Sequence, residues 1–307
     1  MSLFFSIITP SYNRAGMIAA AVESVRAQDY PRWEHIVVDG GSTDGTLEVL
    51  ARYPHLRVVS EPDRGMYDAI NKGIRLARGE VIAWLNTDDL YPPGAFAAVA
   101  EALASHPEAL AVSGAAETFE QTAEGERPLR TDPPVGGEDF WRRIVEAPVP
   151  NGWFFRRAVF DQVGLFNPDF RLVADRDLLI RLALAGIRPV PLERPVYRYC
   201  QHAGSATFHL EDSRHPVYGA RRIEVNREDL RMLAAFLARP DLPGEARRAM
   251  LRAHGEYAYR LTATALYHRR WQYALEGLRA GFRRDPLFAL TFLRYAARRL
   301  ARGGTPK

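Results

Sequence analysis

The stretch Trp84-Leu85-Asn86-Thr87-Asp88-Asp89 joins a predicted buried strand to a polar turn. The apolar run at residues 81–85 has the length and composition of a strand that is covered on both faces. Two adjacent carboxylates at the end of such a strand repel each other and lose water, which costs free energy. A bound Mg²⁺ or Mn²⁺ would remove that cost, because these cations take carboxylate oxygens together with the phosphate oxygens of a substrate. A solvated turn is the alternative, since Asp and Asn are ordinary turn residues.

Short apolar runs alternate with helical segments on either side of this stretch. The alternation predicts an α/β fold with a mostly parallel, Rossmann-like sheet that has helices on both faces. Beyond Pro216 the pattern is helical to the end, which predicts a C-terminal all-helical extension. We expect strands at residues 4–9, 35–39, 56–60, 81–85 and 110–113, helices at 15–27, 45–53, 66–77, 95–104 and 172–185, a loop or irregular hairpin at 116–135, and short strands at 153–155 and 189–201.

Polar clusters follow the first four predicted strands at the points where those strands end. The clusters are Thr9–Arg14, Asp39–Asp44, Glu61–Asp68 and Asn86–Asp89. In open α/β sheets, ligands bind outside the carboxyl ends of the strands. Four such ends at one edge therefore predict a ligand site on stronger grounds than any single cluster.

The stretch Asp39–Gly45 places three glycines between a strand and a helix. Amides at a helix N-terminus suit phosphate, but the chain has neither the dinucleotide-binding glycine motif nor a P-loop at this point. A carboxylate at the strand end can instead accept the ring N–H of a pyrimidine. Capping of the following helix by Ser42 or Asp44 is the structural alternative.

The composition indicates an ordinary globular protein of one or two domains. The 307 residues are 47% hydrophobic and 25% charged, and the single cysteine, Cys200, excludes an intramolecular disulfide. Residues 221–307 hold 19 Lys and Arg against 8 Asp and Glu, so the back of the chain is basic and the front is acidic. The N-terminus lacks the basic flank of a signal peptide, and no apolar run reaches the ~18 residues of a membrane span. We therefore expect a cytoplasmic protein that at most makes peripheral contact with the inner face of a membrane.

Four sequence blocks resemble those of the family-2 glycosyltransferases, which have the GT-A fold. The blocks occur in order at Ile8–Arg14, Val38–Thr46, Glu61–Gly73 and Gly79–Asp89. A weaker fifth block, Ala174–Leu182, is similar to the acidic motif that precedes a helix in that family. The resemblance implies a catalytic domain at residues 1–215, with a nucleotide-binding half at 1–115 and an acceptor half at 116–215, followed by a helical region at 216–307.

The resemblance also implies roles at the donor. The expected nucleotide-binding residues are Thr9, Pro10 and Tyr12 at the base, Asp39 as its hydrogen-bond acceptor, Arg64 and Asp68 near the diphosphate and the sugar, Asn86 and Asp88 at the ribose or sugar, and Arg14. Asp89 is the expected ligand of Mn²⁺ or Mg²⁺, with Asp88 and His202 as further candidates. The chain departs from a strict Asp-x-Asp motif, because Asn86 replaces the first carboxylate.

On the acceptor side, the resemblance implies Asp175 as the general base, with Asp177 as the second choice. Charge complementing the helix dipole is the alternative for this pair. Trp153 and Asn151 lie where the family builds its acceptor site. An exposed Trp would stack on a sugar, although burial in the core is the commoner fate of a Trp. Ser205, in the loop after His202, could reach phosphate.

The C-terminal segment repeats apolar residues at helical spacing, with arginines alongside. These are Leu290, Leu293, Ala297 and Leu300, next to Arg294, Arg298, Arg299 and Arg302. A basic amphipathic helix of this kind can lie on an anionic membrane, pack on the catalytic domain with its Arg side in water, or form a dimer contact.

These observations lead to one expected function and two alternatives. We expect a metal-dependent, inverting glycosyltransferase of the hexosyltransferase type that uses a nucleoside-diphosphate sugar, most simply a UDP-sugar. Its acceptor would be a surface polysaccharide or a lipid-linked glycan of the cell envelope. A nucleotidyltransferase would share the sheet but need a glycine-rich, basic first loop. A non-catalytic nucleotide- or carbohydrate-binding relic is favoured by Asn86 alone.

Overall fold

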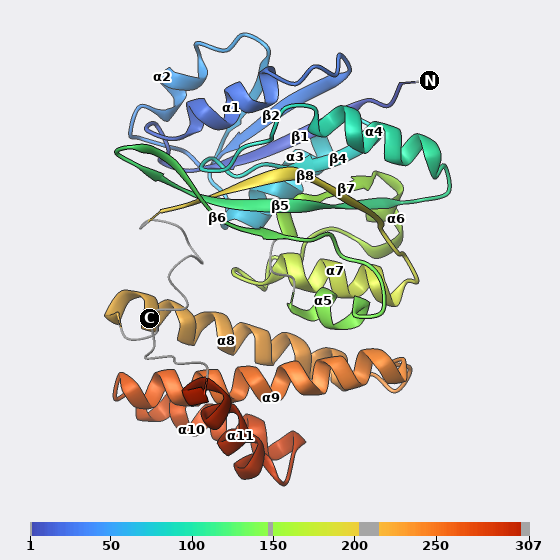
Figure 1. The fold of residues 1–307 in the computed structure, drawn as a ribbon. Coiled ribbons are helices and arrows are strands. Elements are labelled where there is room, and N and C mark those ends of the chain that lie inside the picture. The colour runs from blue at the N-terminus through green and yellow to red at the C-terminus, as the bar shows by residue number, and fades with distance from the viewer. Residues whose placement is uncertain (1, 147–149, 203–214, 302–307) are drawn as a thin grey trace. The chain divides into compact units, whose positions relative to one another are not determined.

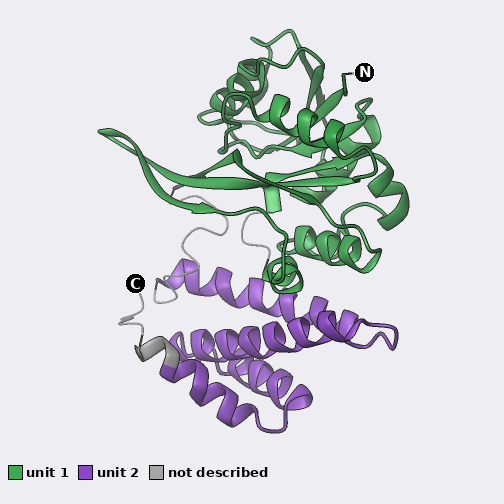
Figure 2. Cartoon of the chain, turned by 45° about the vertical axis from the view of Figure 1, so that its right-hand side comes forward, with its two compact units in different colours: residues 1–201 green, residues 202–307 purple. Residues whose placement is uncertain are grey.

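The computed structural model describes residues 2–146, 150–202 and 215–301, with side chains through residue 297. The chain forms two compact units, residues 1–201 and 202–307 (Figure 2). The first unit contains a sheet and its helices, and the second contains helices (Figure 1). The predicted α/β fold with a C-terminal helical extension is therefore confirmed.

The first unit alternates strands and helices as far as α4 and is mixed after that point. Its elements are β1 (Phe5–Ser11), α1 (Ile18–Arg26), β2 (Trp33–Asp39), α2 (Thr46–Leu50), β3 (Leu56–Ser60), α3 (Met66–Leu76), β4 (Val81–Trp84), α4 (Ala95–Ser105), β5 (Ala111–Thr122), β6 (Gly125–Asp132), α5 (Phe140–Glu146), a 3₁₀ turn (Pro150–Gly152), β7 (Trp153–Arg156), α6 (Ala158–Val163), α7 (Ala174–Leu184) and β8 (Val190–Gln201).

The sheet has eight strands in the order β3-β2-β1-β4-β7-β5-β6, with β8 paired to β5. Strands β1 to β4 run parallel, whereas β7 is antiparallel to both β4 and β5. The register pairs Ser11 with Asp39, and Asp39 with Ser60. The carboxyl ends of β1, β2 and β3 therefore form one row, from which their polar loops begin.

Helices cover the two faces of this sheet because side chains alternate along β1. Phe5 and Ile7 belong to a core cluster that includes residues of α1 and α4. Ile8 points to the opposite face, where α3 lies against it. A Cβ atom at Gly73 would come within 2.4 Å of the Ile8 Cγ2 atom, so this approach of α3 requires a glycine.

The region from residue 111 to 132 forms a long strand, β5, and a hairpin with β6 that has a register shift between Thr118 and Phe119. Of the two predicted forms it is the irregular hairpin, and the strand at 110–113 is longer than predicted. Strand β8 pairs with β5 from Val112 to Glu120 and satisfies its backbone hydrogen-bonding groups. This partner comes from about 80 residues later in the chain, so local sequence gave no sign of it.

The second unit consists, among the residues described, of α8 (Pro216–Leu237), α9 (Gly244–Tyr267), α10 (Trp271–Arg284) and α11 (Phe288–Ala301). Helix α9 packs against the other three. A Cβ atom at Gly277 would lie 2.9 Å from the Ala258 carbonyl oxygen, which shows how closely α10 approaches α9. Tyr259 of α9 contacts Phe292 of α11 with ring centroids 4.8 Å apart. None of the described helices has the length and apolar character needed to cross a membrane.

We predict that buried His35 makes the stability of the first unit depend on pH. Its Nε2 atom lies 2.8 Å from the Thr9 hydroxyl, and burial together with the charge of His55 lowers the pKa of His35 from 6.5 to about 3. The unfolded chain takes up a proton below about pH 6.5 and the folded chain does not until much lower pH. Stability is therefore full above pH 6.5 and falls as the pH is lowered, by about 2 kcal/mol at pH 5.

Urea unfolding followed by tryptophan fluorescence at pH 7 and pH 5 measures this loss. Four of the five tryptophans lie in residues 1–201, so the signal reports mainly the first unit. A His35→Gln variant cannot take up this proton and should lose less stability between the two pH values. Equal losses in the parent and the variant would contradict the prediction.

Candidate active site

The Asp39 carboxylate organises the loop that follows β2. Its Oδ2 atom accepts hydrogen bonds from the amides of Gly41 and Ser42 at 3.0 and 2.8 Å and from the Ser60 hydroxyl at 2.8 Å. Its Oδ1 atom accepts from the Ser42 hydroxyl. Asp39 is fully buried, so four donors from two strand ends replace its water.

The loops after β1 and β2 are joined by side chain to backbone hydrogen bonds. The Asn13 amide donates to the Ser42 hydroxyl at 2.7 Å, and the Thr43 amide donates to the Asn13 side-chain oxygen at 2.9 Å. The Arg14 amide donates to the Thr46 hydroxyl at 2.8 Å. Asn13 has a positive φ of 53°, which Asn tolerates better than most residues. These bonds hold the two loops as one rigid rim.

Three groups converge above the ends of β1, β2 and β3. A Cβ atom at Gly40 would lie 2.7 Å from the Asp63 Oδ2 atom and 3.4 Å from Tyr12 Cδ2. Tyr12 is 59% exposed, so its ring offers a face on which a planar group could stack. The Asp63 carboxylate is fixed by the Gly65 amide at 2.7 Å.

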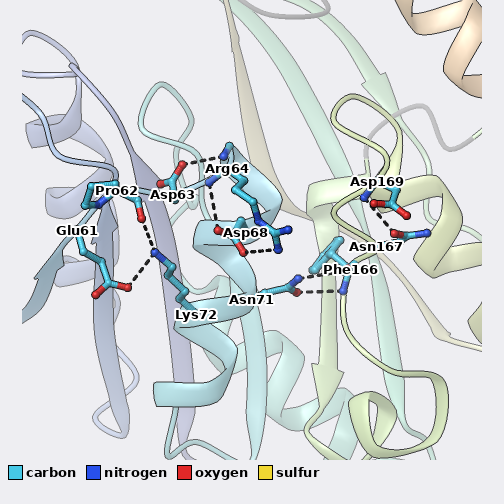
Figure 3. Close-up of polar contacts among 11 residues, drawn as sticks. Glu61, Pro62, Asp63, Arg64, Asp68, Asn71, Lys72, Phe166, Asn167 and Asp169 are labelled. Carbon is cyan, nitrogen blue, oxygen red and sulfur yellow. Dashed lines mark hydrogen bonds and ion pairs between the residues drawn. The ribbon is translucent and has the colours of Figure 1, made fainter.

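Helix α3 begins next to this rim and holds two of the charged side chains (Figure 3). The Arg64 amide donates to Asp68 Oδ2 at 3.1 Å, and the Arg64 guanidinium lies 3.5 Å from Asp68 Oδ1. Burial alone would raise the pKa of Asp68, but the Arg64 amide and the charges of Arg64 and Lys72 outweigh it and lower the pKa. Lys72 is occupied by Glu61 and the Pro62 carbonyl, both at 2.8 Å. Arg64 is exposed and remains the cation of this group that faces solvent.

The other side of α3 binds the segment that precedes α7 (Figure 3). The buried Asn71 amide donates to the Phe166 carbonyl at 2.8 Å and accepts from the Phe166 amide at 3.0 Å. The Phe166 ring stacks on Tyr67, with centroids 5.3 Å apart, and meets Trp84 edge-on at 5.1 Å. Phe166 therefore links α3 to the end of β4.

Tyr67 and Asp175 meet at the N-terminus of α7. The Tyr67 hydroxyl is hydrogen-bonded to the Asp175 carboxylate, and burial raises the pKa values of both groups. Burial also raises the pKa of Asp177, but this carboxylate accepts from the Arg181 Nε and Nη2 atoms at 2.9 and 2.8 Å. Arg181 in turn donates to the Leu165 carbonyl at 2.8 Å. Through Arg181, Asp177 thus fixes the loop before α7, whereas Asp175 is hydrogen-bonded to Tyr67.

The turn after β4 is anchored by Asp89, which is completely buried. Its carboxylate accepts from the Tyr197 hydroxyl at 2.5 Å, from the Cys200 amide at 2.9 Å and from the Asn86 side-chain amide at 3.0 Å. Burial and the neighbouring charge of Asp88 raise the pKa of Asp89 to about 8. Its three donors and its burial make Asp89 the anchor of this turn, and its role as the metal ligand stays a prediction.

Two other side chains of the same turn, Asn86 and Asp88, carry oxygen atoms of the kind that a divalent cation binds. The Asn86 Oδ1 atom is buried and, among the described residues, has no hydrogen-bond donor. Asp88 is half-buried and lies close enough to Asp89 to raise its pKa. A hard cation accepts this combination of a carboxylate and an amide oxygen, completed by substrate oxygens. In the described part of the chain, no three His, Cys, Asp or Glu side chains form a closed metal cluster.

The part of the chain that forms this edge of the sheet matches a known protein family. The model of the family described as Glycosyl transferase family 2 matches residues 6–164, which include the loops after β1, β2, β3 and β4. The chain belongs to glycosyltransferase family 2. It is therefore a glycosyltransferase, and the predicted family is confirmed.

Relatives and solved structures agree with this glycosyltransferase assignment. A PGL/p-HBAD biosynthesis glycosyltransferase of Mycobacterium bovis is 32% identical over 183 residues, which cover 58% of this chain and 68% of the relative. The putative teichuronic acid biosynthesis glycosyltransferase TuaG of Bacillus subtilis is 42% identical over 89 residues, or 27% of this chain and 35% of the relative.

Two solved structures share the GT-A fold. One is the mannosyltransferase PcManGT from Pyrobaculum calidifontis in complex with GDP-Man and Mn²⁺. It has a TM-score of 0.59 at 23% identity, and the matched region is 98% of this chain and 81% of the PcManGT chain. The other is S. aureus TarS 1–349 in complex with UDP-GlcNAc. It has a TM-score of 0.55 at 17% identity, and the matched region is 91% of this chain and 90% of the TarS 1–349 chain.

Several predicted site residues of the glycosyltransferase are buried or already hydrogen-bonded. Trp153 is 1% exposed and stacks on Phe155, so of its two predicted surroundings the structure has the buried one. Asn151 accepts from the Trp84 indole at 2.7 Å. Thr9 is fully buried against His35, and Pro10 is buried beside it, which leaves Tyr12 as the exposed member of the predicted base pocket.

The remaining predicted site residues are Arg14, His202 and Ser205. Arg14 is exposed on the rim formed by the first two loops. His202 is half-buried, directly follows β8 and begins the second unit, and its role as a metal ligand stays a prediction. Ser205 lies outside the described residues.

Sequence reasoning missed several residues that the glycosyltransferase fold brings to this site. Tyr67 and Asn71 stand four residues apart inside the third sequence block, and that helical spacing was a usable signal. Phe166 and Tyr197 carry no local signal, because their partners are about 80 to 110 residues away in sequence. Their roles follow from tertiary contacts alone.

We predict that Tyr197→Phe destabilises the first unit more than Tyr91→Phe. Both hydroxyls are buried, but Tyr197 donates to the Asp89 carboxylate while Tyr91 donates to the Trp84 carbonyl at 3.1 Å. At about pH 9, above the pKa of Asp89, its carboxylate is ionised, and a hydrogen bond to a charged group contributes about 1.5–3 kcal/mol, against about 1 kcal/mol for a neutral pair. Urea unfolding of the two matched variants at this pH measures the difference. An equal loss would show that the Asp89 carboxylate does not depend on this donor.

Proposed function

We propose that this protein transfers a hexosyl group from a nucleoside-diphosphate sugar, most simply a UDP-sugar, with inversion at the anomeric carbon. The proposal rests on a packed contact between two carboxylate-bearing sites, the turn after β4 and the start of α7. Phe166 packs against Trp84 at the end of β4 and against Tyr67, which holds Asp175. The Asn86–Asp89 turn and the Asp175 carboxylate thereby belong to one packed assembly.

The donor side of the proposal rests on the rim of the first three loops. The exposed Tyr12 ring can stack on the base, and Asp63 lies across Gly40 from it. Asp39, the predicted acceptor for the base, orders the loop that carries Gly40. Arg64 is exposed at the start of α3 and can pair with the diphosphate. TarS in complex with UDP-GlcNAc and PcManGT in complex with GDP-Man have the same fold, which supports a sugar nucleotide as the ligand.

The proposed metal ligands are the Asp88 carboxylate and the Asn86 side-chain oxygen. Asp89 supports them by fixing the turn from beneath. A bound Mn²⁺ or Mg²⁺ would act as a Lewis acid that neutralises the leaving diphosphate. The presence of Mn²⁺ in the PcManGT complex is consistent with such a requirement.

Asp175 is the proposed general base. In an inverting transfer, the acceptor hydroxyl oxygen attacks the anomeric carbon as Asp175 takes its proton. The bond from the anomeric carbon to the diphosphate breaks on the opposite face, and its electron pair leaves with the diphosphate. Burial raises the pKa of Asp175, which makes it a stronger base than an exposed carboxylate. Tyr67 fixes the orientation of the carboxylate.

The proposed acceptor is a glycan, either a surface polysaccharide or a lipid-linked oligosaccharide made on the cytoplasmic side of the membrane. The names of the relatives support this class, since they refer to PGL/p-HBAD and to teichuronic acid biosynthesis. The buried Trp153 takes no part in holding that acceptor.

We expect UDP to bind more tightly than GDP or dTDP, and to depend on Mn²⁺. Calorimetric titration with each nucleotide, with and without metal, measures both preferences. Asp88→Asn should abolish the effect of Mn²⁺ on UDP affinity while the fold remains intact. Asn86→Ala should weaken that effect. A chain that binds none of the three nucleotides, or an Asp88→Asn variant that keeps the full metal effect, would overturn the donor side of the proposal.

We expect Asp175→Asn to lower the rate of sugar transfer by at least about 10²-fold while leaving UDP affinity within twofold. Asp177→Asn serves as the matched control. It should lower the unfolding midpoint through loss of the Arg181 pair, with a smaller effect on the rate per folded molecule. Tyr67→Phe should reduce kcat about tenfold with little change in donor KM and move the pH–rate profile, because Asp175 loses its neighbour. Full activity in Asp175→Asn would exclude it as the base.

A further inference from the structure

The second unit exposes an apolar stripe along α10. Trp271, Leu275 and Phe282 are 63%, 52% and 45% exposed. Their spacing of four and seven residues places them on one side of the helix. Tyr267, at the end of α9, is 58% exposed just before this side begins. Large apolar side chains gathered on one helix side usually mark a contact surface.

Positive charge accompanies this stripe. Arg279 and Arg283 are exposed on the same helix, and Arg269 and Arg270 are exposed at the preceding corner. Glu276 is the single acidic residue between Tyr257 and Arg284. It is hydrogen-bonded to Arg227 of α8 at 2.8 Å, so its charge is already neutralised. The surface therefore combines apolar and basic groups with no free acid of its own.

We propose that this surface binds the headgroup region of an anionic phospholipid bilayer. We call it the α10 stripe and define it as Tyr267, Trp271, Leu275 and Phe282 together with Arg279 and Arg283. Trp and Tyr prefer the boundary between water and acyl chains, and exposed Leu and Phe add apolar area that can enter it. Arginines beside them gain from the negative potential of the lipid surface.

The charge of the stripe argues against a second copy of the chain as its occupant. A two-fold contact would place the same surface on both partners. Both partners would then bring Arg279 and Arg283 into a contact whose own surface supplies no free acid to pair with them, and like charges in a desolvated contact repel each other. An anionic membrane supplies the opposite charge and accepts the apolar side chains as well.

Vesicle sedimentation with the full chain tests this proposal. The vesicles contain phosphatidylcholine, either alone or with about one third phosphatidylglycerol, at ~0.1 M salt and without nucleotide or acceptor. We expect binding to the anionic vesicles to be at least tenfold tighter than to the neutral ones. Arg279→Gln with Arg283→Gln should weaken the anionic binding about 25-fold, from roughly fivefold for each charge. Trp271→Ser with Leu275→Ser should weaken it at least tenfold.

A matched control pair is Leu251→Ser with Arg252→Gln. Both residues are exposed on α9, about four turns before Tyr267, and the pair removes the same kinds of group. It should keep the binding of the parent within twofold, and circular dichroism should show all variants folded. Absence of binding by the parent, an equal loss in the control pair, or stripe variants that change the sedimentation mass and not vesicle binding would each overturn the proposal. Because no donor is present, failure here is separate from failure of the proposed transfer.

Discussion

The buried carboxylate of Asp89 is the constraint on which the first unit depends. A carboxylate without water must receive hydrogen bonds, and Asp89 obtains two of its three donors from β8, at Tyr197 and Cys200. The backbone continues this contact, since Leu90 and Arg198 exchange hydrogen bonds of 2.9 and 2.8 Å. The end of β4 is therefore fixed to a strand more than 100 residues later. The turn that presents Asn86 and Asp88 has its position because Asp89 has these partners.

At two places, one of two acidic residues close in sequence fixes the local fold while the other has different partners. In the β4 turn, Asp89 is the buried anchor, Asp88 is half-buried, and the Asn86 Oδ1 atom has no hydrogen-bond donor within the described part of the chain. At the start of α7, Asp177 is paired with Arg181, which leaves Asp175 to Tyr67. Burial raises the pKa values of Asp89, Asp175 and Asp177. One member of each pair stabilises the fold, and the other is the one proposed to take part in the chemistry.

The sequence predicted the parts of this arrangement that local pattern determines. The four strand-end clusters, the family and the helical C-terminal region followed from alternation and from contiguous blocks, because each strand end lies next to its own loop in sequence. The cost of two adjacent carboxylates after β4 was also foreseen, and a metal ion was expected to remove it. In the structure, the Tyr197 hydroxyl and the Cys200 amide donate hydrogen bonds to Asp89, and the metal ion stays a prediction. No pattern near residue 89 could indicate this, because the donors belong to a strand whose pairing is non-local.

Trp153 is a second residue whose surroundings depend on strand pairing that the local sequence does not indicate. The family resemblance suggested an acceptor site at Trp153, whereas its side chain is buried and stacks on Phe155. Trp153, Phe154 and Phe155 are all buried, so both faces of β7 are covered. This burial follows from the pairing of β7 with β4 and β5, which the local sequence does not contain.

Helix α3 connects the donor side to the catalytic side through its own periodicity. Tyr67 and Asn71, four residues apart, contact Asp175 and Phe166. Asp68 and Lys72 are displaced from them by one residue, which rotates them about 100° towards the loop at 61–64. A helix pressed against Ile8 through Gly73 can neither slide nor rotate without moving both sets of contacts. The position of the proposed base and that of Arg64, the arginine proposed to bind the diphosphate, are thus both fixed by contacts to this one helix.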